Sequence, residues 1–222
     1  VSSGVAQALR RDHPALPCLV VPNLVRTPGE VVRPAGGAPV EIVSLGRLHE
    51  NKDFGLLIRA FAQLARSGLD ARLTIGGEGP ELDALKALAA QEGVAERVRF
   101  PGWIGDRAAF FAGADLFVLS SRVEPFGIVV IEAMAHGVPV IATRTAGPLD
   151  IIEPGQTGLL VDCEDVGGMS AALGDLIADP DRARRIGAAG RQSALERWSF
   201  DAVAARMAQA VDQLTDGWAR AR

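Results

Sequence analysis

The stretch that decides the fold is Glu124-Pro125-Phe126-Gly127-Ile128-Val129-Val130-Ile131-Glu132-Ala133-Met134-Ala135-His136-Gly137. The apolar run just before it, residues 115–119, is typical of a buried parallel strand. Gly137 stands where a helix would end, and a second apolar run, residues 139–142, follows at once. The order strand, turn, helix, strand predicts a βαβ unit. Its turn lies at the carboxyl end of a strand, where open α/β sheets bind their ligands.

The turn itself has the chemistry of an anion and sugar site. Pro125 suits a first helical turn, and Gly127 allows a ligand to approach the backbone. The free N–H groups and the positive end of the helix dipole favour an anion. Glu124 and Glu132 can accept hydrogen bonds from hydroxyl groups. The alternative, which the spacing alone leaves open, is an ordinary α/β turn whose first acid only complements the helix dipole.

This order of residues resembles the Glu-x7-Glu motif of the family 4 retaining glycosyltransferases, which are GT-B enzymes that use nucleotide-sugar donors. The two acids are Glu124 and Glu132, with Phe126-Gly127 between them and Ala133-x-x-x-Gly137-x-Pro139-Val140 downstream. The resemblance extends over nearly the whole chain. It implies the C-terminal, donor-binding half of a GT-B enzyme, which transfers a sugar from a nucleotide diphosphate to an acceptor with retention at the anomeric carbon.

Six apolar runs alternate mostly with segments of helical period, and this predicts the fold class. In the first helical segment Phe54, Leu57, Ile58, Phe61 and Leu64 recur at steps of three or four residues. Strands that alternate with such helices predict an α/β fold, a Rossmann-like parallel sheet with helices on both faces. The predicted strands are residues 41–45, 72–75, 98–100, 116–119, 140–142 and 158–161.

The two ends of the chain are predicted to belong to a larger arrangement. Residues 1–36, with a short helix over 1–11 and a strand over 17–23, resemble the tail of an N-terminal domain and its linker. The nucleotide-sugar-binding domain is expected over 37–197. Helices are expected over residues 166–178, from Pro180 to Leu195 and, capped by Ser199, through Leu214. In the family the segment corresponding to 198–222 is a helix that returns to the N-terminal domain.

Two details of these end segments depart from the family. The linker reads Pro22-Asn23-Leu24 where the family usually has Pro-Asn-Gly. The corner before the last helix reads Trp198-Ser199-Phe200, which is similar to the family's Phe-Ser-Trp corner with the aromatics rearranged.

A pair of cations follows the first predicted strand. Arg47 offers a planar fork of donors and Lys52 a point charge, a combination that fits a diphosphate. The spacing Gly46-Arg47-Leu48-x-x-x-Lys52 looks like the family's diphosphate clamp. The family usually has glycine after the lysine, whereas this chain has Asp53. That extra carboxylate either weakens the positive potential or caps the following helix.

The resemblance assigns the remaining parts of the donor. Gly127 and Ile128 would join the diphosphate site through their N–H groups, and Glu132 would hold the ribose. Glu124, with Phe126 and Gly127, would contact the donor sugar. Glu124 is also the candidate catalytic carboxylate, with its role as nucleophile or orienter left open.

Two loops after the second and third strands complete the expected site. The same resemblance implies that Trp103 and Ile104 lie at the nucleotide base, although the Trp103 ring could instead stack on its own domain. The glycine-rich turn at 76–80 is a poor match to a dinucleotide fingerprint and is expected near the ligand, with direct contact left open.

No metal or cofactor is predicted. Asp179-Pro180-Asp181 imitates an Asp-x-Asp metal motif, but it stands at a helix start, where these residues are expected as caps. No cluster of His, Cys and carboxylates at metal spacing occurs in the sequence. His136, at the end of the central helix, complements the dipole there.

Composition limits the partners. The chain has 222 residues, 48% hydrophobic and 23% charged, which is ordinary for a globular protein. Its net charge of −4 gives no electrostatic basis for binding nucleic acid. The sequence shows no signal peptide and no apolar run of the roughly 20 residues needed to span a membrane. Cys18 and Cys163 are predicted to be reduced thiols of a cytoplasmic protein, with any peripheral membrane contact made by the N-terminal domain.

The expected partners are therefore a nucleotide-sugar donor, an acceptor that is a glycan, a lipid-linked sugar or a small molecule, and the N-terminal domain. The chain alone is expected to bind nucleotide weakly and to transfer little sugar. Two alternatives remain at this point: a non-catalytic nucleotide-sugar-binding subunit, and a GT-B sugar-nucleotide epimerase.

Overall fold

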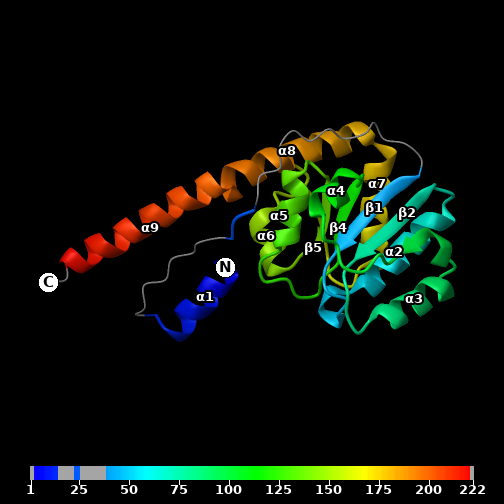
Figure 1. Cartoon of the computed structure of the whole chain (residues 1–222), viewed down its shortest axis with the longest axis horizontal. Helices are drawn as coiled ribbons and strands as arrows, with labels where there is room; N and C mark the ends of the chain where they lie inside the picture. The colour runs from blue at the N-terminus through cyan, green and yellow to red at the C-terminus, as the bar shows by residue number, and fades with distance from the viewer. Residues whose placement is uncertain (1–2, 15–22, 26–38, 221–222) are drawn as a thin grey trace.

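The fold is built on one parallel sheet of six strands in the order β3-β2-β1-β4-β5-β6 (Figure 1). The computed structural model describes residues 3–14, 23–25 and 39–220. Each of the six strands predicted for the sheet is present, with its ends shifted by at most one residue. The strands are β1 Val40–Leu45, β2 Ala71–Gly76, β3 Val98–Arg99, β4 Leu116–Leu119, β5 Val140–Thr143 and β6 Leu159–Val161.

Helices cover both faces of this sheet. One layer contains α2 (Phe54–Arg66), α3 (Leu82–Gln91) and α7 (Val166–Ala178). The other contains α4 (Arg107–Ala112), α5 (Ile128–Ala135), α6 (Ala146–Ile151) and α8 (Pro180–Trp198). Two short 3-10 turns, η1 (Glu50–Lys52) and η2 (Ala95–Arg97), precede α2 and β3. The α/β fold class predicted from the alternating pattern is confirmed.

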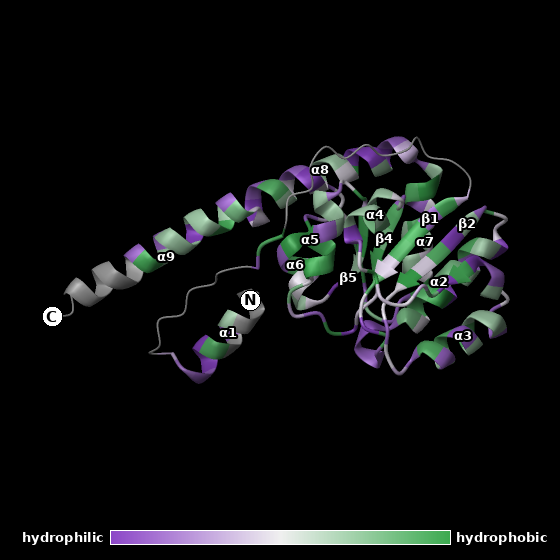
Figure 2. Ribbon diagram, viewed as in Figure 1, coloured by the Kyte–Doolittle hydropathy of each residue, from purple (hydrophilic) through white to green (hydrophobic). Residues whose placement is uncertain are grey.

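The strands read as continuous apolar runs because both of their faces are buried. Along β1, Ile42 packs into the core under α2 and α7, and its neighbour Val43 packs into the core under α5. Along β4, Val118 and Phe117 divide in the same way. Successive side chains of a strand point to opposite faces, so each central strand supplies both cores. The hydropathy colouring shows these strands mostly hydrophobic (Figure 2).

The strand order indicates the edge of the sheet at which a ligand would bind. From β1 the chain proceeds outward to β2 and β3, then returns to place β4 on the other side of β1. The loops that follow β1 and β4 therefore lie side by side at the carboxyl edge of the sheet, where the strand order reverses. In open α/β sheets this reversal point is the usual ligand site.

The C-terminal part is helical as predicted. The Asp179 carboxylate accepts a hydrogen bond from the Arg182 N–H at 2.9 Å, and the Ser199 hydroxyl accepts one from the Ala202 N–H at 3.3 Å. Asp179 is thus a helix cap, and within the described ranges no group of three His, Cys, Asp or Glu side chains could hold a metal. After Ser199, α9 (Phe200–Arg220) continues roughly in line with α8 and projects beyond the sheet (Figure 1).

The N-terminal segments are described only in part. Helix α1 (Ser3–Asp12) is present where a helix was predicted and contacts α6. The predicted strand at 17–23 lies almost entirely outside the described residues. Val25 is described: it is buried, and its N–H donates to the Trp198 carbonyl at 3.0 Å. The domain limits at 36–37 and 197–198 stay a prediction.

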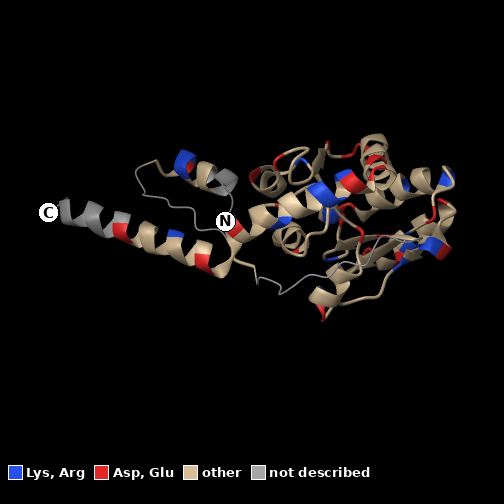
Figure 3. Ribbon diagram, turned by 90° about the horizontal axis from the view of Figure 1, so that it is seen from above, with Lys and Arg blue, Asp and Glu red and all other residues tan. Residues whose placement is uncertain are grey.

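Basic and acidic residues are interspersed along the ribbon (Figure 3). The part of the chain that the structure describes contains no helix both long and apolar enough to cross a membrane.

Candidate functional site

The point between β1 and β4 where the strand order reverses brings together a cation and an acid from distant parts of the sequence. Lys52, from the loop after β1, places Nζ 2.5 Å from Oε2 of Glu124, which lies in the loop after β4. The two residues are 72 positions apart. Both side chains are largely covered, with 25% of Lys52 and 11% of Glu124 exposed. Lys52 and Glu124 therefore meet at one edge of the sheet, while the ligand that they bind stays a prediction.

A second ion pair of reversed polarity lies directly beside the first. Asp53 accepts a hydrogen bond at Oδ2 from Nε of Arg122 at 2.8 Å. The Arg122 N–H donates to the Asn51 carbonyl at 2.9 Å, so side chain and backbone bind the same two loops. The hydrogen bond with Asp53, followed by its charge, raises the pKa of Arg122.

The structure shows what Asp53 does at the position where the family usually has glycine. Its φ of 43° is left-handed, a conformation for which glycine is the usual residue. Its Oδ1 accepts a hydrogen bond from the Leu56 N–H at 3.1 Å, which caps α2. Of the two readings offered by the sequence, the capping role is confirmed. Its charge is paired with Arg122 rather than directed at Lys52.

The glycine-rich turn after β2 packs on the protein's own backbone. A Cβ atom on Gly77 would lie 1.8 Å from the Gly46 carbonyl oxygen, and one on Gly79 would lie 2.2 Å from that of Leu48. The Leu48 N–H donates to the Glu78 carbonyl at 2.9 Å. These glycines are therefore required by the close approach of two loops, and they hold the segment that carries Arg47 in place.

The N-terminus of α5 has the form expected of an anion site. Gly127 is its N-cap with φ of 92°, and no side chain caps the helix. The loop before it is fixed to α6, because the Gly147 N–H donates to the Glu124 carbonyl at 2.8 Å. A Cβ on Gly147 would lie 2.1 Å from the Phe126 carbonyl oxygen. Ile128, the first residue of α5, is 38% exposed, so the first turn faces solvent.

Glu132 is held by a residue that the sequence did not suggest. Nη1 of Arg107 lies 2.7 Å from both carboxylate oxygens of Glu132. Arg107 begins α4, a short helix that was not predicted, and Asp106 caps that helix by accepting from the Ala109 N–H at 2.9 Å. At the other end of α5, His136 is the C-cap and places Nδ1 2.8 Å from the Glu132 carbonyl oxygen, the position predicted for it.

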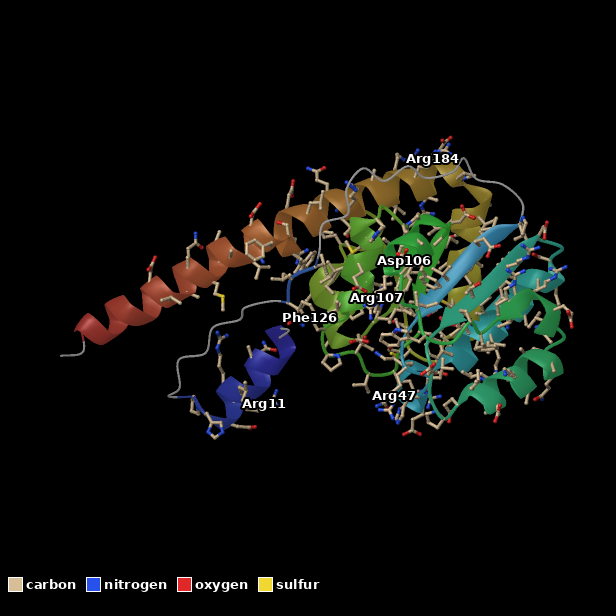
Figure 4. The ribbon with its side chains drawn as sticks, in the orientation of Figure 1. Arg11, Arg47, Asp106, Arg107, Phe126 and Arg184 are labelled. Carbon is tan, nitrogen blue, oxygen red and sulfur yellow. The ribbon has the colours of Figure 1, made fainter. Side chains whose placement is uncertain are left out.

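Arg47 and Trp103, like Ile128, are exposed members of the predicted set. Trp103 is 70% exposed, which excludes the alternative that its ring stacks on its own domain. The loop that carries it is anchored by the Gly77 N–H, which donates to the Gly102 carbonyl at 2.7 Å. Ile104 packs partly against the core beside Gly76. Arg47 is exposed and forms no ion pair with any described side chain (Figure 4). Contact of Trp103 and Ile104 with a base stays a prediction.

Comparison with known proteins settles the family. Residues 32–193 match the family described as "Glycosyl transferases group 1". The chain belongs to this family. It is 42% identical over 183 residues to the GDP-mannose-dependent alpha-(1-6)-phosphatidylinositol monomannoside mannosyltransferase of Mycolicibacterium smegmatis, a match covering 78% of this chain and 48% of that protein. The chain thus spans about half the length of this group 1 relative.

Solved structures of group 1 type agree with the fold. The sucrose-phosphate synthase of Thermosynechococcus elongatus superposes with a TM-score of 0.83 at 29% identity, over 98% of this chain and 58% of that one. The separately solved C-terminal domain of a group 1 family protein (LpcC) from Francisella tularensis gives a TM-score of 0.70 at 25% identity. That match covers 79% of this chain and 99% of the C-terminal domain. The chain therefore corresponds to the C-terminal, donor-binding half of a GT-B protein.

Proposed function

We propose that this chain binds a nucleotide-diphosphate sugar and forms the donor half of a retaining hexosyltransferase. The observation that carries the proposal is the contact between Lys52 and Glu124 at the reversal point of the sheet. A cation suited to phosphate and an acid suited to sugar hydroxyls are adjacent there. In a nucleotide sugar, the phosphate and the anomeric carbon are likewise adjacent.

The chemistry of transfer requires negative charge to grow on the leaving diphosphate while the sugar becomes positively charged. Arg47, Lys52 and the N–H groups at Gly127 and Ile128 would stabilise that charge electrostatically. Lysine carries three N–H donors, so Lys52 can bind a phosphate oxygen while it keeps its bond to Glu124.

The acids and the base loop would orient the donor. Glu124 and Phe126 would hold the sugar in the geometry required for reaction, and Glu132 would bind the ribose. Trp103, whose ring is exposed, offers a face for the nucleotide base, with Ile104 behind it.

The acceptor would bind to the N-terminal half of the enzyme, since the relatives are about twice as long as this chain. We therefore expect the isolated chain to bind nucleotide and to show little or no transfer. The name of the Mycolicibacterium smegmatis relative places GDP and GDP-mannose first among the ligands to test.

Calorimetric titration of the chain with GDP, UDP, ADP and inorganic pyrophosphate tests the proposal. A nucleoside diphosphate should bind, and Lys52→Ala or Arg47→Ala should each weaken its binding about tenfold, because a charge-assisted hydrogen bond is lost. The control is Lys86→Ala, an exposed lysine on α3, which should leave binding unchanged. Absence of binding by all three nucleotides, or equal losses in Lys86→Ala, would falsify the proposed site.

A further inference from the structure

We infer that Arg107 is a positioning residue for Glu132 and that it gives the site its preference for ribose over deoxyribose. The inference rests on the proposed function. Its basis is the position of Arg107 Nη1, 2.7 Å from both oxygens of the Glu132 carboxylate (Figure 4). The group it would help to recognise is the pair of neighbouring hydroxyls of a nucleoside ribose.

Local structure gives no reason for a cation at position 107. Arg107 is the first residue of α4, where the helix dipole opposes positive charge and acids are usually found. Asp106 already caps the helix, so α4 does not require the arginine side chain. Departures from local rules of this kind are expected at functional sites. The contact that compensates for this position is the one across to α5.

The geometry leaves the carboxylate able to bind a diol. A carboxylate oxygen has two lone-pair positions, and a single nitrogen of Arg107 occupies one on each oxygen of Glu132. The second position on each oxygen stays available for a hydroxyl donor. The Glu132 side chain is 21% exposed, so without Arg107 it can turn toward water. Arg107 holds it in one orientation, which removes an entropic cost from ligand binding.

The same ion pair connects the loop that is proposed to bind the base with Glu132, the acid that is proposed to bind the ribose. Arg107 directly follows the loop that carries Trp103 and Ile104, and Gly102 anchors that loop to the turn after β2. Because Glu132 lies on α5, the Arg107–Glu132 contact fixes the base-binding and ribose-binding parts relative to each other. Loss of Arg107 should therefore reduce recognition of the sugar hydroxyls more than recognition of the phosphates.

The test measures a ratio of affinities. Dissociation constants of the chain for GDP and 2′-deoxy-GDP, and for UDP and 2′-deoxy-UDP, are measured in wild type, Arg107→Ala, Arg107→Lys and Glu132→Gln. Arg107→Ala should reduce the preference for ribose about tenfold, toward the value for Glu132→Gln, with binding of inorganic pyrophosphate unchanged. Arg107→Lys keeps the charge and should restore part of the preference. Arg184→Ala, an exposed arginine on α8, is the matched control (Figure 4).

The outcomes separate this inference from the proposed function. If Glu132→Gln lowers the preference for ribose and Arg107→Ala does not, Arg107 has no positioning role while the proposed site stands. Tighter nucleotide binding by Arg107→Ala would mean that the arginine competes with the ribose, which also overturns the inference. If no nucleotide binds to wild type, the proposed function fails and the inference fails with it.

Discussion

Asp53 and Arg122 form an ion pair of 2.8 Å beside the one between Lys52 and Glu124, with the charges reversed. On the loop after β1, Lys52 directly precedes Asp53. On the loop after β4, Arg122 stands two positions before Glu124. Opposite charges therefore attract at both contacts between the two loops. The Ser120 hydroxyl adds a hydrogen bond of 2.8 Å to the Lys52 carbonyl. The loop after β1 is thereby held on the loop after β4, and Lys52 is held beside Glu124.

Two replacements of Asp53 should distinguish what its charge contributes to the free energy of unfolding from what its capping hydrogen bond contributes. Asp53→Asn keeps a capping oxygen and tolerates the left-handed φ, so it should lower the free energy of unfolding only slightly, through loss of the partly exposed ion pair. Asp53→Ala also loses the cap and places alanine at positive φ, and it should cost about 2 kcal/mol more. Urea unfolding measures both.

The control for Asp53 is Asp165→Ala, which removes the cap of α7 at an ordinary φ of −88°. It should cost about 1 kcal/mol. Equal losses for Asp53→Ala and Asp165→Ala would show that neither the backbone conformation nor the Arg122 pair contributes.

Neutralising Glu124 should have opposite effects on stability and on phosphate binding. Glu124→Gln leaves the largely covered Lys52 without its acid, so the free energy of unfolding should fall by about 1 kcal/mol. The same change removes a negative charge from the proposed diphosphate site and releases Lys52. Affinity for inorganic pyrophosphate should rise about fivefold at low salt, measured by calorimetry. Unchanged or weaker binding would place the pyrophosphate away from Lys52.

The positions of the strands along the chain could be predicted because β1, β4 and β5 are buried on both faces and so appear as continuous apolar runs. Helices α4 and α6 were missed for the converse reason. Each has only six residues, too few to establish a period. Strand β3 is a two-residue strand, shorter than predicted, because Phe100 already belongs to the loop toward Trp103.

Within the site, sequence order predicted which loops converge but not every contact between them. Parallel strands bring their carboxyl ends to one edge, so Lys52 and Glu124 could be placed together from motif positions. The Arg107–Glu132 contact joins two helices through side-chain geometry, 25 residues apart, and no local pattern indicates it. Likewise, nothing in the sequence indicates why position 77 requires glycine. The structure gives the reason, which is the close approach of the Gly46 carbonyl to Gly77.

The close approach of the Gly46 carbonyl to Gly77 predicts a large loss of stability for Gly77→Ala. Gly77 and Gly93 both have positive φ, 129° and 75°, but a Cβ on Gly93 would meet no atom within 4 Å. Gly93→Ala should cost about 1 kcal/mol for the backbone alone, whereas Gly77→Ala should cost more than about 3 kcal/mol because the loop bearing Arg47 must move. Thermal and urea unfolding measure the difference. Similar losses for the two variants would contradict the packing described for this turn.

The exposed thiol of Cys163 should react slowly at moderate pH. Partial burial raises its pKa, and the charges of Asp162 and Glu164 raise it further. Since the thiolate is the nucleophile, a raised pKa lowers the reactive fraction at about pH 8 and moves the rise of the alkylation rate to higher pH. Iodoacetamide labelling followed by peptide mass mapping, which separates Cys163 from Cys18, measures this rate.

Asp162→Asn and Glu164→Gln should each move the rise of the Cys163 alkylation rate back toward lower pH. The control Glu96→Gln, which changes an exposed acid on η2, should not. A Cys163 rate equal to that of free glutathione across the pH range would show that burial and neighbouring acids do not affect this thiol.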